Sequence, residues 1–151
     1  MKNKKESVIE SSSLKELNIL VGEWYAEATH PLFEHLLKGK VSLGWLEGNS
    51  FLFMNSDCEK PGPPDSRSIS GYDESTDHFT MLYFDERNVS RIYEMTFSNG
   101  IWKLWRNIPV FSQRFNGIIK TDGNTIKGVW DLCEGDINWK KDLVTTYKRI
   151  K

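Results

Sequence analysis

The segment from Leu20 to His30 constrains the fold of this chain more than any other stretch. One side of the alternation is apolar apart from its last residue, and it consists of Leu20, Gly22, Trp24, Ala26, Ala28 and His30. The other side carries mostly polar residues, including Glu23 and Glu27. A period of two indicates a β-strand with one dry face and one wet face. Gly22 stands two residues before the bulky Trp24, and this strand, together with the hairpins that follow it, suggests the first strand of a closed barrel.

Hairpin signals follow this strand along the chain. Gly48-Asn49, Asn99-Gly100 and Asp122-Gly123 are two-residue turns of the kind that joins antiparallel strands. The turn at Asn99-Gly100 pairs Met95 with Leu104 and sets the register of its hairpin. Further alternating segments are separated by short polar turns, so the sequence predicts about ten strands after a short helix at residues 13–20.

Short turns and regular alternation predict an all-β fold, an up-and-down antiparallel β-barrel. A sandwich of two sheets is the alternative. Such sandwiches need long connections between sheets, and only the segments near 31–37 and 60–66 are long. We expect a polar, disordered tail at residues 1–12 and a single barrel domain at 13–151.

Composition narrows the function classes. Lysine plus arginine number 20 and aspartate plus glutamate 21, so the net charge is −1. This balance argues against nucleic acid and against a polybasic membrane anchor, and no apolar run approaches the length of a membrane-spanning helix. Cys58 and Cys133 form no metal-binding or disulfide pattern, which predicts reduced thiols in a cytoplasmic protein. We predict neither a metal nor a cofactor.

Gly22-x-Trp24 after a short helix, with Tyr147-x-Arg149 at the end of the last strand, resembles the calycin superfamily. That group comprises lipocalins, fatty-acid-binding proteins and nitrobindins, and the chain is also similar to uncharacterised bacterial lipocalin-like proteins. The resemblance implies that the first and last strands pair. It also implies that a basic residue, here Arg149 or Lys148, packs over Trp24 through a cation–π contact.

The chain departs from these families in two respects. It lacks the signal peptide and the disulfide of secretory lipocalins. No histidine follows His78, so the C-terminal half offers no candidate for a haem ligand of the nitrobindin kind.

Three polar residues give the candidate binding site. The hairpin register places Arg91, Tyr93 and Arg106 on one otherwise apolar face. Two guanidinium groups and a phenol suit a carboxylate, sulfonate or phosphate. The alternative is a structural network in which Asp85 or Asp73 neutralises both arginines.

Further residues on the same faces complete the predicted ligand-binding set. Aromatic side chains would hold an apolar body, and a polar pair would lie beside them. These residues are Trp45, Tyr83, Trp130, Gln113 and His30. For His30, at the end of its strand, the simplest alternative is a hydrogen bond to a backbone carbonyl.

The sequence is compatible with three functions. The first is a binding protein that holds a small amphipathic molecule, most simply an anion, inside the barrel. The second is an interaction or structural barrel with a packed interior, a homodimer joined through a patch such as Leu46, Phe51 and Phe53. The third is an isomerase or hydrolase that uses His30, Tyr83 or Asp85 as acid or base. The sequence has no nucleophile motif, so we assign no catalytic residue.

Overall fold

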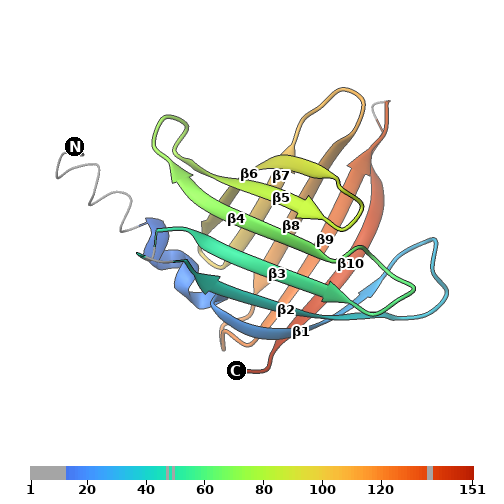
Figure 1. Cartoon of the computed structure of the whole chain (residues 1–151), viewed down its shortest axis with the longest axis horizontal. Helices are drawn as coiled ribbons and strands as arrows, with labels where there is room; N and C mark the ends of the chain where they lie inside the picture. The colour runs from blue at the N-terminus through green and yellow to red at the C-terminus, as the bar shows by residue number, and fades with distance from the viewer. Residues whose placement is uncertain (1–12, 47, 49, 136–137) are drawn as a thin grey trace.

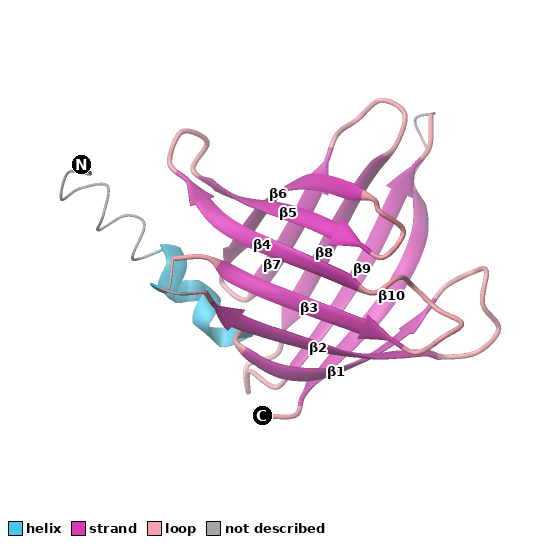
Figure 2. Cartoon of the chain, in the orientation of Figure 1, coloured by secondary structure: helices cyan, strands magenta, loops and turns pink. Residues whose placement is uncertain are grey.

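The computed structural model describes residues 13–46, 48, 50–135 and 138–151. The alternating segments form ten antiparallel strands in one closed barrel (Figures 1 and 2). The strands are β1 (Gly22–Thr29), β2 (Leu37–Trp45), β3 (Leu52–Cys58), β4 (Ser66–Asp73), β5 (His78–Asp85), β6 (Ser90–Ser98), β7 (Ile101–Arg106), β8 (Ser112–Ile119), β9 (Thr125–Cys133) and β10 (Lys140–Arg149). The predicted tail at 1–12 lies outside the described residues.

Pairing of the first and last strands closes the barrel. β1 pairs with β2 on one side and with β10 on the other, and Trp24 lies directly opposite Arg149. Every other strand pairs with its neighbours in sequence. The prediction of an up-and-down barrel is confirmed, and the two-sheet sandwich is excluded.

The register predicted for the Asn99-Gly100 hairpin is also correct. Met95 pairs with Leu104 across the Asn99-Gly100 turn, where both turn residues have positive φ, 52° and 75°. Leu43 pairs with Met54 across the β2–β3 turn. These registers fix which side chains point inward, because neighbouring residues of a strand point to opposite faces.

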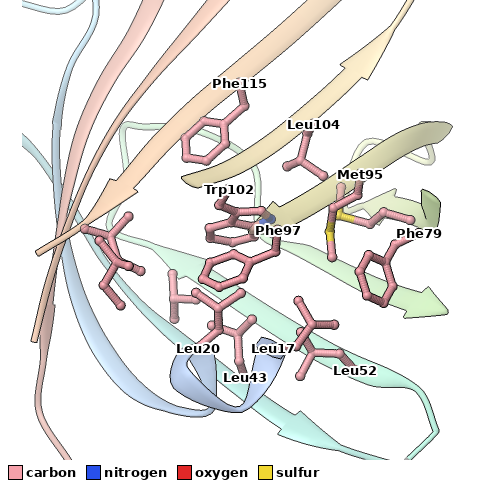
Figure 3. Packing of buried hydrophobic residues seen from close by; sticks show 14 of the residues in the cluster. Leu17, Leu20, Leu43, Leu52, Phe79, Met95, Phe97, Trp102, Leu104 and Phe115 are labelled. Atoms are coloured by element: carbon pink, nitrogen blue, oxygen red, sulfur yellow. The ribbon is translucent and has the colours of Figure 1, made fainter. Parts of the chain in front are cut away.

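A short helix covers one end of the barrel (Figure 2). Its last turn is the 3₁₀ helix η1 (Leu17–Leu20), and both terminal leucines have no exposed surface. Figure 3 shows Leu17 and Leu20 beside Leu43 and Leu52, under the rings of Phe97 and Trp102. We call this end, sealed by η1, the closed end.

Arg149 locks the closed end. Its guanidinium lies 4.1 Å from the centre of the Trp24 ring, as the calycin resemblance implied. It donates hydrogen bonds to the carbonyl oxygens of Val21 (2.7 Å) and Gly123 (2.9 Å), and also to that of Ile19. Trp24 Nε1 donates to the carbonyl of Leu20 at 3.0 Å, so helix, first strand and last strand are joined at one point.

The opposite end is called the mouth. It is formed by the connections that lead from β1, β3, β5, β7 and β9 to the next strand (Figure 1). No helix in the described part of the chain is long and apolar enough to cross a membrane.

Candidate ligand-binding cavity

The barrel encloses a cavity of about 560 Å³. This volume lies within the range of sites for small molecules. Its wall consists of inward-facing strand residues, together with mouth residues such as Phe33, Pro63 and Phe111. Since Leu17 and Leu20 fill the closed end and do not line the cavity, the cavity lies toward the mouth.

The cavity has one aromatic wall. Phe115 on β8 and Trp130 on β9 are cross-strand partners with ring centres 5.1 Å apart. Tyr93 contacts Trp130 edge-to-face at 5.7 Å, and Trp102 contacts Phe115 at 5.4 Å. The opposite wall, on β1 to β4, carries small residues, among them Ala26 and Ser68. A ligand body can therefore lie against the rings while the small residues leave it room.

A polar group lies on the β5–β8 side of this space. The hydroxyl of Tyr93 donates a hydrogen bond to Oε1 of Gln113 at 2.7 Å, and both residues are buried. Arg91 lines the cavity next to them, with its guanidinium 5.0 Å from the centre of the Phe111 ring. Because Gln113 accepts through its oxygen, its amide nitrogen keeps donor hydrogens for another partner.

Arg91 lacks an acidic partner in the part of the chain that the structure describes. Among the described residues, no carboxylate oxygen lies within 4.0 Å of its side-chain nitrogens. The acidic residues of the cavity lining are Glu134 and Asp142, and Asp142 pairs with His30. A partly buried guanidinium without a counter-ion is unfavourable, so Arg91 is poised to bind an anion.

Asp85 is neutralised by a different arginine. Its carboxylate is fully covered and accepts hydrogen bonds from Arg87 Nη2 at 2.6 Å and from the Tyr83 hydroxyl at 2.8 Å. The hydrogen bond from Arg87 lowers the pKa of Asp85 well below its usual range. Asp73 instead accepts from Ser75 in its own turn. The predicted network in which Asp85 or Asp73 pairs with Arg91 and Arg106 is therefore wrong.

The phenols of the cavity stay neutral near pH 7. Burial raises the pKa of Tyr83, and the hydrogen bond to the Asp85 carboxylate raises it further. Burial also raises the pKa of Tyr93, and it raises that of Tyr147 to about 12. None of these groups can supply the negative charge that Arg91 lacks.

His30 pairs with a residue that sequence reasoning did not find. Its Nε2 lies 2.6 Å from Oδ1 of Asp142, and the backbone amide of Leu32 donates to its Nδ1 at 3.0 Å. Since Nδ1 accepts, Nε2 carries the ring hydrogen and donates a hydrogen bond to the Asp142 carboxylate. The predicted backbone-carbonyl partner is therefore wrong. Both ring nitrogens are occupied, so the pair ties β1 to β10 at the mouth.

Six of the eight predicted site residues line this one cavity: Arg91, Tyr93, Tyr83, His30, Gln113 and Trp130. Trp45 lies elsewhere, because its Nε1 donates to Oδ1 of Asn18 beside the closed end at 2.8 Å. Arg106 lies next to Gln113 in the sheet but does not line the cavity. Among the described residues, its buried Nε has no hydrogen-bond partner.

Other lining residues escaped the sequence analysis. Asp142 points inward because a bulge between Lys141 and Leu143 breaks the alternation of β10, and the sequence carries no signal for that bulge. Ser66 and Ser68 carried a signal, since strict alternation along β4 places both on the inner face with Ser70.

A closed ten-stranded antiparallel barrel, locked by Trp24 and Arg149 and holding an interior cavity, is a calycin-like fold. Among solved structures, the chain is similar to Rv2717c from M. tuberculosis, with 12% identity, a TM-score of 0.62, and coverage of 92% of this chain and 98% of that one. It is also similar to the S-type phycobiliprotein lyase CPES from Guillardia theta, with 11% identity, a TM-score of 0.63 and 99% of each chain covered. At these identities the likeness shows the fold alone. No protein-family model matches the chain, and no curated protein matches it.

Proposed function

We propose that this protein binds a small amphipathic anion inside its barrel, with the anionic group on Arg91 and the apolar body against Phe115 and Trp130. The main observation behind the proposal is that Arg91 faces the cavity without an acidic partner among the described residues. It faces a cavity of about 560 Å³, and no carboxylate of the described residues lies within 4.0 Å of it. A carboxylate, sulfonate or phosphate would fill that position with bidentate hydrogen bonds.

The neighbours of Arg91 support this assignment. The amide nitrogen of Gln113 can donate a further hydrogen bond to the same anion. Tyr93 holds the oxygen of Gln113 and thereby fixes the orientation of that amide. The rings of the aromatic wall provide the large apolar contact area that an amphipathic ligand needs.

The cavity argues against a barrel with a packed interior. Of the three residues predicted for a homodimer patch, Phe51 is 49% and Leu46 is 38% exposed, whereas Phe53 is half-buried. A homodimer and a cytoplasmic location stay predictions from the sequence.

One observation favours an enzyme instead, namely a carboxylate within hydrogen-bond distance of His30 in the cavity wall. A general base needs a ring nitrogen that faces the substrate. Leu32 and Asp142 occupy both nitrogens of His30, so we rank catalysis below binding.

Binding of 2-naphthoate and of its neutral amide, measured by calorimetry, tests the proposal. We expect the carboxylate to bind more tightly than the amide. Arg91→Met should weaken carboxylate binding about tenfold or more, since a hydrogen bond to a charged group contributes about 1.5–3 kcal/mol.

Arg114→Met is the matched control. Arg114 is half-exposed on the outer face and pairs with Asp131 at 3.4 Å, so its loss should leave the affinity unchanged. Equal binding of acid and amide, or equal weakening in both variants, would contradict the proposal.

A further inference from the structure

Three serine side chains line one side of the cavity in direct register. Ser56 on β3 pairs with Ser66 on β4, and Ser68 is the next inward-facing residue of β4. Ser68 is only 5% exposed, yet neither its hydroxyl nor that of Ser66 bonds to another described residue. We call these residues the serine wall.

The hydroxyls of Ser66 and Ser68 border the cavity, so water or a ligand group can reach them. They are not among the fully buried polar atoms of the described residues that lack a partner, which are His78 Nδ1, Trp102 Nε1 and Arg106 Nε. Alanine in the same positions would offer a ligand no hydrogen bond. The serine wall thus provides unused hydrogen-bonding groups inside a cavity whose other surfaces are largely apolar.

The serine wall lies across the barrel from the aromatic wall. In the closed order of strands, β3 and β4 stand five places from β8 and β9 respectively, which is half of the ten-strand circuit (Figure 1). Phe115 and Trp130 on those strands form the ring pair described above. A ligand between the two walls meets rings on one side and hydroxyls on the other.

Arg91 lies two strands away from the serine wall. Ser68 pairs with Tyr83, and Tyr83 pairs with Arg91, so two strand spacings separate Ser68 from Arg91. At about 4.8 Å per spacing, their backbones lie about 10 Å apart. The guanidinium of Arg91 lies against the Phe111 ring, which precedes β8, and not on the β4 side of the barrel. We therefore expect the group that reaches the serines to be a different part of the ligand from the anionic group on Arg91.

We infer that the ligand is a flat aromatic anion with a second hydrogen-bonding group, a hydroxyl or a carbonyl, at the far side of its ring system from the acid. This inference rests on the proposed function and names the class of ligand for the same site. The ring stacks on Phe115 and Trp130, and the second polar group bonds to Ser66 and Ser68. A saturated alkyl chain would leave the serine hydroxyls without partners.

Four probes test the inference by calorimetry on the full chain: dodecanoate, 2-naphthoate, 3-hydroxy-2-naphthoate and 6-hydroxy-2-naphthoate. We expect the 6-hydroxy acid to bind about fivefold more tightly than 2-naphthoate, because it adds one hydrogen bond to the serine wall. The 3-hydroxy acid, whose hydroxyl is next to the carboxylate, should show no such gain. Dodecanoate should bind most weakly.

The double variant Ser66→Ala, Ser68→Ala should remove the advantage of the 6-hydroxy acid and leave 2-naphthoate binding unchanged. Ser90→Ala on the outer face is the matched control and should change neither affinity. The comparison among ligands on the wild-type chain needs no variant and decides the question even if the double variant does not fold.

Two results would overturn this inference but not the proposed function. Equal affinities for the three naphthoates would mean that the serine hydroxyls serve only bound water. Tightest binding of dodecanoate would assign the cavity to alkyl chains. In both cases an anion still binds, and the proposed function stands. If none of the four acids binds, the proposed function fails and the inference fails with it.

Discussion

Arg87 and Arg91 flank the start of β6, and their surroundings give them different roles. Arg87 closes on Asp85, whose carboxylate is fully covered, and so forms a structural ion pair. Arg91 lines the cavity and lies over the Phe111 ring, and it pairs with no acid among the described residues. Sequence reasoning found Arg91 through the inward register of β6. It assigned Asp85 to the wrong arginine, because the turn that brings Arg87 back over Asp85 has no alternating pattern.

Asp85 should make the stability of the protein depend on pH in acid. Its pKa is lowered in the folded state, so its ionised form stabilises the fold fully above its unfolded pKa of about 3.9. That contribution is lost as the pH falls from about 4 through the folded pKa. Urea unfolding of Asp85→Asn should show lower stability at pH 7 and a shallower decline below about pH 4. An unchanged decline would contradict this role for Asp85.

At the scale of elements, the helix before β1 and the strand ends define the two ends of the barrel. The strands and their registers could be predicted because alternation and tight turns are local signals. The short helix predicted at residues 13–20 is present, with Leu17 and Leu20 turned into the barrel and Ile19 40% exposed. The bulge in β10 could not be predicted, because tertiary packing determines where a strand takes up an extra residue.

The helix should contribute to stability through its buried leucines alone. Leu17→Ala removes a fully buried side chain next to Leu43 and Leu52, so we expect a loss of about 2–5 kcal/mol in the free energy of unfolding. Ile19 lies two residues further along the helix and is exposed. Ile19→Ala should lower the free energy of unfolding by less than about 1 kcal/mol. Urea unfolding of both variants measures the difference, and equal losses would mean that the helix does not seal the barrel.

The pair of His30 and Asp142 should hold the mouth connection between β1 and β2. Asp142→Ala removes the acceptor for Nε2 of His30, and the ring can then leave the amide of Leu32. Hydrogen exchange should show faster exchange at Leu32, with amides of β6 and β7 unchanged. Faster exchange throughout the barrel would assign the pair to global stability instead.

For the whole molecule, closure of the sheet determines which surfaces are available. A closed barrel has no exposed strand edges, and it turns every second residue toward an interior that can be either filled or hollow. The sequence predicted the closure through Trp24 and Arg149. It could not predict the cavity, because free volume depends on how Phe115, Trp130 and the facing small residues pack together. The same limit explains Trp45, which alternation placed inward but which packs at the closed end.

The six tryptophans give the most direct test of the central claim, that an anion binds inside the barrel. Trp102 and Trp130 line the cavity, Trp24 and Trp45 lie at the closed end, and Trp139 packs under Arg114. Indole N–H signals in a ¹H–¹⁵N spectrum should be followed as 2-naphthoate is added. We predict saturable shifts at Trp102 and Trp130 that are lost in Arg91→Met. Trp105 packs against His78 and does not line the cavity. Shifts confined to Trp105 and Trp139, or none at saturating ligand, would contradict the account.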